Sequence, residues 1–176
     1  MPQVFTNIFE TGWGVICTAA TSEGLTHITL PSDNSDFFDS LLNKHYAGWR
    51  RVEGSEDNRT AETQLREYLD GKRKEFDLRL HLTGTDFQKQ VLSEVARIPY
   101  GQTATYGEIA RRIDKPGASQ AVGAANGSNP LPIVIPCHRI VAGDGIGGYA
   151  GGLELKRKLL KLEGASLDRT DNLSLF

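Results

Sequence analysis

Residues 133–139 read Ile-Val-Ile-Pro-Cys-His-Arg, so an apolar run ends in a proline and Cys137, His138 and Arg139 follow at once. The β-branched residues of the run predict a strand that ends there. A structural cysteine usually lies inside an apolar run, whereas Cys137 comes after its last aliphatic residue. A thiol in this position, with a base and a permanent cation as neighbours, is suited to nucleophilic chemistry.

The composition limits the kind of site that this cysteine can belong to. The chain has 176 residues and two cysteines, Cys17 and Cys137, which exclude a disulfide framework and a cysteine-rich zinc site. We find no nucleotide-binding glycine motif or metal-ligand cluster and expect neither a cofactor nor a metal. The start of the chain has no signal for export, and no apolar run approaches the roughly 18 residues of a membrane span. We expect a monomer in a reducing compartment, the cytoplasm or, in a eukaryote, the nucleus.

The charge is unevenly distributed along the chain. Residues 1–85 carry 9 Lys and Arg against 13 Asp and Glu, whereas residues 86–176 carry 11 against 9. The half that contains Cys137 is therefore mildly basic, which permits nucleic acid as a partner without requiring it.

Residues 1–82 predict a small α/β domain with an antiparallel sheet. Asp33 or Ser35 could cap a first helix, a second helix is expected from about Thr60 to Gly71, and residues 76–82 alternate as a strand would. Cys17 lies within an expected strand and is interpreted as a core residue. The expected meander consists of Val4 to Phe9, Gly14 to Ala20 and Leu25 to Leu30.

After a boundary at residues 83–85 the pattern becomes helical, and residues 83–168 are expected to form the second domain, with a tail at 169–176. A helix capped by Thr85 or Asp86 should end before Pro99. Thr105 and Glu108 have capping-box spacing at the start of a second helix. A third helix, from 118 to 125, consists of small residues, and the last two helices together match a helix-turn-helix.

The helix-turn-helix could equally be an ordinary helical pair that packs a core. Arg111, Arg112 and Lys115 cluster at the turn, where they could meet phosphates. A long helix with side chains for base edges is missing, which favours binding through the DNA backbone and the minor groove with little sequence preference.

Four motifs in the second half share the order and spacing of one family. From about Thr85 to Gly164 the chain resembles the O6-alkylguanine-DNA alkyltransferases, also called methylated-DNA-protein-cysteine methyltransferases. The first 80 residues fit the variable N-terminal domain of that family only in outline. The motifs are Asn129-Pro130, Ile135 to Ile140, Tyr149 to Leu153 and Leu159 to Gly164.

The resemblance implies direct-reversal DNA repair in a mixed α/β protein with a C-terminal winged helix-turn-helix. The alkyl group of O6-alkylguanine, and of O4-alkylthymine, would move irreversibly to Cys137, so each molecule would act once. By the same resemblance His138 takes the thiol proton through a water molecule and Glu163 orients the histidine. The two neighbouring side chains can cooperate only if the backbone turns there, and Pro136 makes such a turn plausible.

The remaining site residues also come from the resemblance, with double-stranded DNA as the partner. Tyr106 would press on the phosphate of the target and bond the flipped base, Asn129 would tie the helix-turn-helix to the active-site loop, and Tyr149 would wall the base pocket. Arg139 is interpreted as structural support, in an ion pair that fixes the active-site loop.

Two positions depart from the family pattern. Gln120 stands where many members have an arginine that fills the space left by the extruded base, so we expect weaker DNA binding. Ala150 stands where some relatives have serine, which could admit alkyl groups bulkier than methyl. Two other functions stay open: a non-catalytic DNA binder, against which Cys137 argues, and a cysteine hydrolase, which leaves the helix-turn-helix unexplained.

Overall fold

The computed structural model describes residues 1–165, and the expected tail at 169–176 lies outside them. The chain divides into two compact units between Thr83 and Gly84, the first of which is Met1–Thr83. No helix among the described residues is long and apolar enough to cross a membrane.

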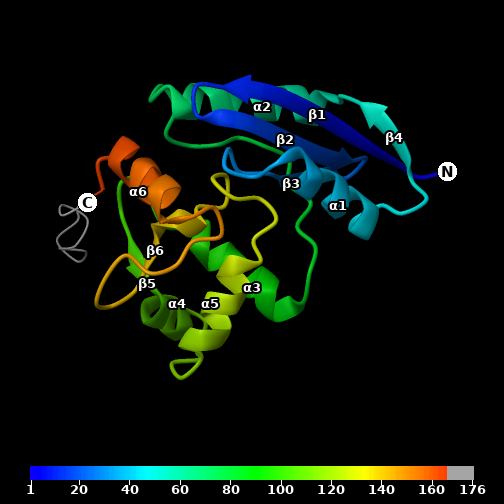
Figure 1. The fold of residues 1–176 in the computed structure, drawn as a ribbon. Coiled ribbons are helices and arrows are strands. Elements are labelled where there is room, and N and C mark those ends of the chain that lie inside the picture. Colours follow the sequence, from blue (N-terminus) through cyan, green and yellow to red (C-terminus); the bar gives the residue numbers. More distant parts are fainter. Residues whose placement is uncertain (166–176) are drawn as a thin grey trace. The chain divides into compact units, whose positions relative to one another are not determined.

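The first unit contains a four-stranded sheet in the order β3-β2-β1-β4 (Figure 1). The strands β1, β2 and β3 form the predicted antiparallel meander, while β4 pairs with β1 in parallel and was not predicted. At four residues, with both arginines exposed, β4 shows no apolar alternation that would reveal it in the sequence. The strands are β1 (Gln3–Thr11), β2 (Gly14–Thr21), β3 (Gly24–Ile28) and β4 (Arg50–Glu53).

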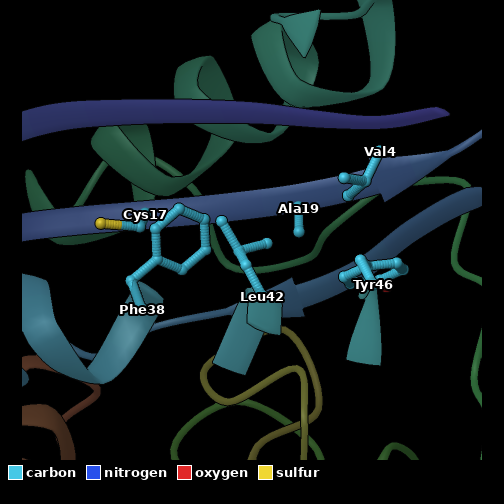
Figure 2. Packing of buried hydrophobic residues seen from close by; sticks show 6 residues of the cluster. All are labelled: Val4, Cys17, Ala19, Phe38, Leu42 and Tyr46. Atoms are coloured by element: carbon cyan, nitrogen blue, oxygen red, sulfur yellow. The ribbon is translucent and has the colours of Figure 1, made fainter. Parts of the chain in front are cut away.

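Two helices cover opposite faces of this sheet. Helix α1 (Ser35–His45) buries Phe38 and Leu42 against Val4, Cys17 and Ala19, as Figure 2 shows. The prediction that Cys17 is a core residue is therefore confirmed. The cap of α1 is Asn34, whose side chain accepts from the backbone N–H of Phe37; the expectation of Asp33 or Ser35 was wrong by one residue.

Helix α2 (Glu56–Leu69) covers the other face and begins earlier than the predicted Thr60. Its start is fixed by a capping box between Ser55 and Asn58, which apolar periodicity does not reveal. The Asn58 side chain is fully buried and donates to Thr18 Oγ1 at 2.8 Å and to the carbonyl oxygens of Phe5 and Thr18, both at 3.3 Å. One amide therefore joins the helix to two strands.

The strand predicted at residues 76–82 does not form. Leu80 makes only an isolated parallel bridge with Leu25. At Asp77 the backbone is satisfied by the side chain of Gln64, whose amide accepts from the Asp77 N–H at 2.8 Å and donates to the Asp77 carbonyl at 2.9 Å. Further along, the segment bonds to β3 through its backbone: the Leu25 N–H donates to the Arg79 carbonyl and the His81 N–H donates to the Leu25 carbonyl, both at 2.8 Å. The alternating pattern thus corresponds to one short contact with the sheet and not to a full strand.

The second unit is helical, with a two-residue parallel pairing between β5 and β6. The predicted helix before Pro99 and the predicted Thr105–Glu108 capping box are both confirmed, and helices α3, α4 and α5 pack on one another. The predicted fold class is confirmed: a mixed α/β protein with a mainly antiparallel N-terminal sheet and a C-terminal helix-turn-helix. Its elements are α3 (Asp86–Val95), β5 (Ala104–Thr105), α4 (Tyr106–Arg112), α5 (Ser119–Gly127), the 3-10 helix η1 (Cys137–Arg139), β6 (Ile140–Val141) and α6 (Leu153–Leu162).

Candidate active site

The approach to Cys137 is a pair of tight turns and not the predicted strand. Ile133 has φ of 72°, a rare value for a β-branched residue, and Pro132 bridges to Ile135 across the turn. Pro136, with φ of −81° and ψ of 66°, is the centre of an inverse γ-turn closed by the 2.8 Å bond from Cys137 N–H to the Ile135 carbonyl. The backbone therefore turns at Pro136, as cooperation between Cys137 and His138 requires, and both side chains belong to one turn of 3-10 helix.

The turn is tied to the helix-turn-helix by two amide side chains. Asn129 Nδ2 donates to the Ile135 carbonyl at 2.8 Å, and Asn126 Nδ2, from α5, donates to the Cys137 carbonyl at 3.3 Å. The first bond is of the kind that the sequence predicted for Asn129. Asn126 was missed, although a buried polar residue in a helix of small residues is a recognisable signal.

The Cys137 thiol is buried, 5% exposed. Burial raises its pKa, while the side chains of Asn129 and Tyr149 and the charge of Lys156 act in the opposite direction. Its surroundings therefore offer donors and a cation to a thiolate, which is what a nucleophilic cysteine requires.

His138 and Glu163, which are 25 residues apart in the sequence, meet in the interior. His138 Nε2 lies 2.9 Å from Glu163 Oε1, and neither side chain is accessible to solvent. Burial alone would raise the pKa of Glu163, but its hydrogen bonds to His138 and Arg139 lower the pKa to about 2. Burial lowers the pKa of His138, and the bond to Glu163 opposes that change. The carboxylate is charged at neutral pH and can hold the imidazole in one orientation.

Arg139 lies beside this pair, as the prediction of an ion pair required. Its Nη2 is 2.8 Å from Glu163 Oε1, its Nε is 2.9 Å from Oε2, and its Nη1 donates to the Ile98 carbonyl at 2.6 Å. Arg139 is 6% exposed, so the interaction is buried. One carboxylate therefore receives both the imidazole and the guanidinium.

Residues 142–152 form a loop that carries Tyr149 and is held by Lys156 of α6. The Lys156 ammonium donates to the carbonyls of Ile140 and Ile146 at 2.6 Å and of Gly148 at 3.0 Å, and the residue has no solvent exposure. Burial lowers its pKa to about 8. Sequence reasoning missed Lys156, although it lies on the apolar stripe of an amphipathic helix with Leu159 and Leu160.

Tyr106, at the start of α4, lies against the same loop. A Cβ added to Gly147, which has φ of 73°, would lie 3.1 Å from the Tyr106 hydroxyl oxygen. Burial raises the pKa of the Tyr106 hydroxyl, and a hydrogen bond with the backbone of Gly148 opposes the shift. The loop can approach the tyrosine this closely because Gly147 has no side chain.

The remaining predicted residues lie apart from the cysteine. Arg111, Arg112 and Gln120 are exposed on α4 and α5, and the Lys115 ammonium lies 5.0 Å from the centre of the Phe87 ring. The structure thus gathers Cys137, His138, Arg139 and Glu163 in the interior and leaves these polar side chains on the surface. Among residues 1–165, no group of three or more His, Cys, Asp or Glu side chains is placed to hold a metal ion.

Fold and site together define a two-unit α/β protein whose helical unit joins a helix-turn-helix to a buried cysteine, histidine and carboxylate. The family model described as "6-O-methylguanine DNA methyltransferase, DNA binding domain" matches residues 86–165. Over 159 residues the chain is 44% identical to the methylated-DNA–protein-cysteine methyltransferase of Methanosarcina acetivorans, covering 90% of this chain and 97% of that protein. The chain therefore belongs to the methylated-DNA–protein-cysteine methyltransferase family.

Other relatives agree with this assignment. The inducible enzyme of the same name from Bacillus subtilis is 39% identical over 146 residues, which are 82% of each chain. The crystal structure of Mycobacterium tuberculosis OGT in complex with DNA covers 99% of both chains at 36% identity, with a TM-score of 0.77. The similarity thus extends over both units and not only over the motifs around the cysteine.

Proposed function

We propose that this protein repairs alkylated DNA by moving the alkyl group from O6 of guanine to Cys137, once per molecule. The observation that carries the proposal is the single turn that presents Cys137 and His138 together while Glu163 holds the histidine at 2.9 Å. The same chemistry on O4-alkylthymine would need no further group. No cofactor enters the reaction, because the nucleophile is the thiol itself.

Each of the three buried groups has one task in this reaction. Cys137 sulfur attacks the alkyl carbon, the bond from that carbon to O6 breaks, and guanine keeps the electron pair. His138 takes the thiol proton through a water molecule. Glu163 orients the imidazole and stabilises the positive charge that the imidazole then carries. The thioether that forms is permanent, since the other cysteine of the chain, Cys17, is buried in the core of its own unit.

Double-stranded DNA is the proposed partner, bound through its backbone and minor groove by a monomer. The exposed Arg111 and Arg112 support phosphate contacts, and Gln120 on α5 supports a role in filling the space of the extruded base. Tyr106 would press on the target phosphate and bond the flipped base, with Tyr149 as one wall of the pocket. DNA in the crystal structure of the M. tuberculosis relative is consistent with this partner.

The domain roles follow from the same proposal. Residues 83–168 would bind DNA and carry out the transfer, and residues 1–82 would have a structural role. A chain with two cysteines, one of which must remain a thiol, suits a reducing compartment such as the cytoplasm or nucleus.

Intact mass after incubation with an oligonucleotide containing one O6-methylguanine tests the proposal. We expect a gain of one CH₂ group that stops at one per chain, is absent from Cys137→Ser and persists in the matched control Cys17→Ser. Continuous turnover would point to a hydrolase instead. Tight, damage-dependent binding with no mass gain would make the protein a recognition factor.

The size of the alkyl group is a second part of the proposal. Ala150 provides no hydroxyl for the guanine oxygen and leaves room in the pocket wall. We expect Ala150→Ser to lower the preference for benzyl over methyl by a few-fold, because the larger side chain takes space from the bulkier alkyl group at a cost of about 1 kcal/mol. Competition between the two alkylguanines in one reaction measures this ratio, and an unchanged ratio would remove Ala150 from the determinants of specificity.

A further inference from the structure

The Glu163 carboxylate is shared between two donors, and the sharing is unequal. Oε1 receives His138 Nε2 at 2.9 Å and also Arg139 Nη2 at 2.8 Å, while Oε2 receives Arg139 Nε at 2.9 Å and the Gly101 N–H at 3.4 Å. The two bonds from Arg139 persist whatever the protonation state of the histidine, because a guanidinium keeps its charge. The negative charge of Glu163 is therefore already balanced before His138 takes up a proton.

Charged and titratable groups lie around His138 on several elements. Lys156 and Glu163 approach from α6, Arg139 and Cys137 belong to the turn itself, and Tyr100 lies on the segment after α3, with its ring centre 5.7 Å from the Arg139 guanidinium carbon. Helix α3 also packs on the turn, and the residues that it buries are apolar: Val91, Leu92 and Val95. The Glu163 carboxylate therefore bonds to both the Arg139 guanidinium and the His138 imidazole.

A histidine paired with a carboxylate alone would hold an added proton strongly, since the two would form a buried ion pair. Alkyl transfer requires more than the uptake of the thiol proton by His138, because guanine must gain a proton at N1 after the alkyl–O6 bond breaks. The proton that leaves Cys137 balances the proton that guanine gains. If His138 kept that proton, guanine would have to take its proton from water instead.

Resting on the function proposed above, we infer that Arg139 is a positioning residue that weakens the hold of His138 on its proton, so that the histidine passes the proton on to guanine. Arg139 acts through Glu163, which it grips with two nitrogens, and makes no contact with the alkyl group. Fixing the loop is then only part of its task. The cation beside the imidazole has the same effect on the pKa of His138 as burial, which lowers it.

Substitution of Arg139 separates this role from a purely structural one. In Arg139→Gln the carboxylate loses its bonds to the guanidinium and keeps its bond to His138, so the midpoint of His138 protonation should rise by about one pH unit or more, a tenfold gain in proton affinity. Arg139→Lys keeps the charge but loses the two-pronged grip, and its midpoint should rise less. Proton NMR of the imidazole follows the titration directly, because the chain has only 4 histidines.

The kinetic readout should follow the same order. As the pH is lowered, the rate of transfer from O6-benzylguanine falls when His138 becomes protonated. In Arg139→Gln this fall should begin at a higher pH than in the wild-type protein, with Arg139→Lys between the two. Equal midpoints for His138 in the wild type and both variants would overturn the inference, even if the rates fell. If Arg139→Gln fails to fold, an unchanged midpoint in Arg139→Lys overturns it equally. The titration needs no substrate, so its outcome is independent of whether Cys137 accepts alkyl groups.

Discussion

Each unit of the molecule buries one cysteine, at least one histidine and one asparagine, yet the charged groups beside these residues differ. In the sheet unit burial raises the pKa of Cys17, a hydrogen bond with Thr29 opposes this shift, and the charges of Asp33 and Asp39 add to it. In the helical unit, the groups around Cys137 besides its own burial are amide and hydroxyl donors and the Lys156 cation. Burial and a hydroxyl neighbour are common to both cysteines, so neither marks the reactive one. The neighbouring charge does, since carboxylates lie near Cys17 and a lysine lies near Cys137.

The two histidines differ in the same way. His27 Nδ1 lies 3.1 Å from the hydroxyl oxygens of Thr26 and Tyr46, and its ring is 4.8 Å from that of His45. His138 is bonded to a carboxylate instead. A hydroxyl partner makes a satisfied core residue, whereas a carboxylate partner can stabilise the charge that a general base acquires.

The largest expected effect contrasts these two histidines. We expect His138→Gln to lower the rate of methyl transfer about 10²–10⁴-fold, the usual contribution of a positioned general base. His27→Gln should transfer at nearly the wild-type rate. Single-turnover kinetics with an O6-methylguanine oligonucleotide measure both, and equal losses in the two variants would break the comparison.

The second prediction concerns acid stability and belongs to the sheet unit. Burial, followed by the charge of His45, lowers the pKa of His27 to about 4, against an ordinary value of 6.5. Between these values the unfolded chain binds the proton more strongly, so the unit should lose stability as the pH falls from 6.5 to 4. The loss is at most about 3 kcal/mol, from 1.36 kcal/mol per pH unit.

Urea titrations across this pH range measure the effect. The chain has 2 tryptophans, Trp13 and Trp49, and both lie in the sheet unit, so their fluorescence reports that unit alone. In His27→Gln the dependence on pH should be flatter. The same steep slope in both proteins would show that another group titrates.

The contrast between the units also explains which parts of the structure the sequence could predict. The meander, the capping boxes at Thr85 and Thr105 and the turn at Pro136 depend on residues close together in the chain. The strand predicted at 76–82 is reduced to a single bridge with Leu25, because the side chain of Gln64 satisfies the backbone of Asp77. Strand β4 was missed because its partner is almost fifty residues away.

The site shows the same division between local and distant contacts. Cys137, His138 and Arg139 are adjacent in the sequence and could be singled out from it, whereas Glu163 was assigned only through the family resemblance. Asn126 and Lys156 were missed, since each acts on the backbone of a segment at least eight residues away. Contacts from a side chain to a distant backbone leave no periodic signal in the sequence.

The two buried asparagines sharpen the comparison at a smaller scale. Asn58 has both ends of its amide bonded, to Ser55 on one side and to Thr18 on the other. Asn126 donates to the Cys137 carbonyl, but its buried Oδ1 accepts no hydrogen bond from any residue in the described part of the chain. An unsatisfied buried acceptor costs about 1–3 kcal/mol, so Asn126 adds little to the stability of the fold. Its hydrogen bond to the Cys137 carbonyl instead fixes the backbone of the nucleophile.

Leucine at each position should therefore give opposite results. Asn58→Leu should destabilise the sheet unit by about 1–3 kcal/mol with little change in the transfer rate. Asn126→Leu should leave stability nearly unchanged and slow transfer about tenfold, the equivalent of one lost hydrogen bond of roughly 1.4 kcal/mol. Urea denaturation measures the stability and single-turnover kinetics measure the transfer rate. Slow transfer by Asn58→Leu together with wild-type transfer by Asn126→Leu would contradict the roles given to the two asparagines.

The smallest effect concerns the exposed face of α5, which carries Gln120 at the surface. The side chain brings no charge to the DNA, so Gln120→Arg should tighten binding a few-fold and steepen the decrease of log affinity with log salt by about 0.9, the value for one added phosphate contact. The matched control is Gln90→Arg, which adds the same charge at an exposed position on α3. Fluorescence anisotropy with an unmodified duplex at several salt concentrations measures the slope. If both variants steepen the slope equally, the gain in affinity reflects net charge alone, and the proposal that α5 contacts the DNA would be contradicted.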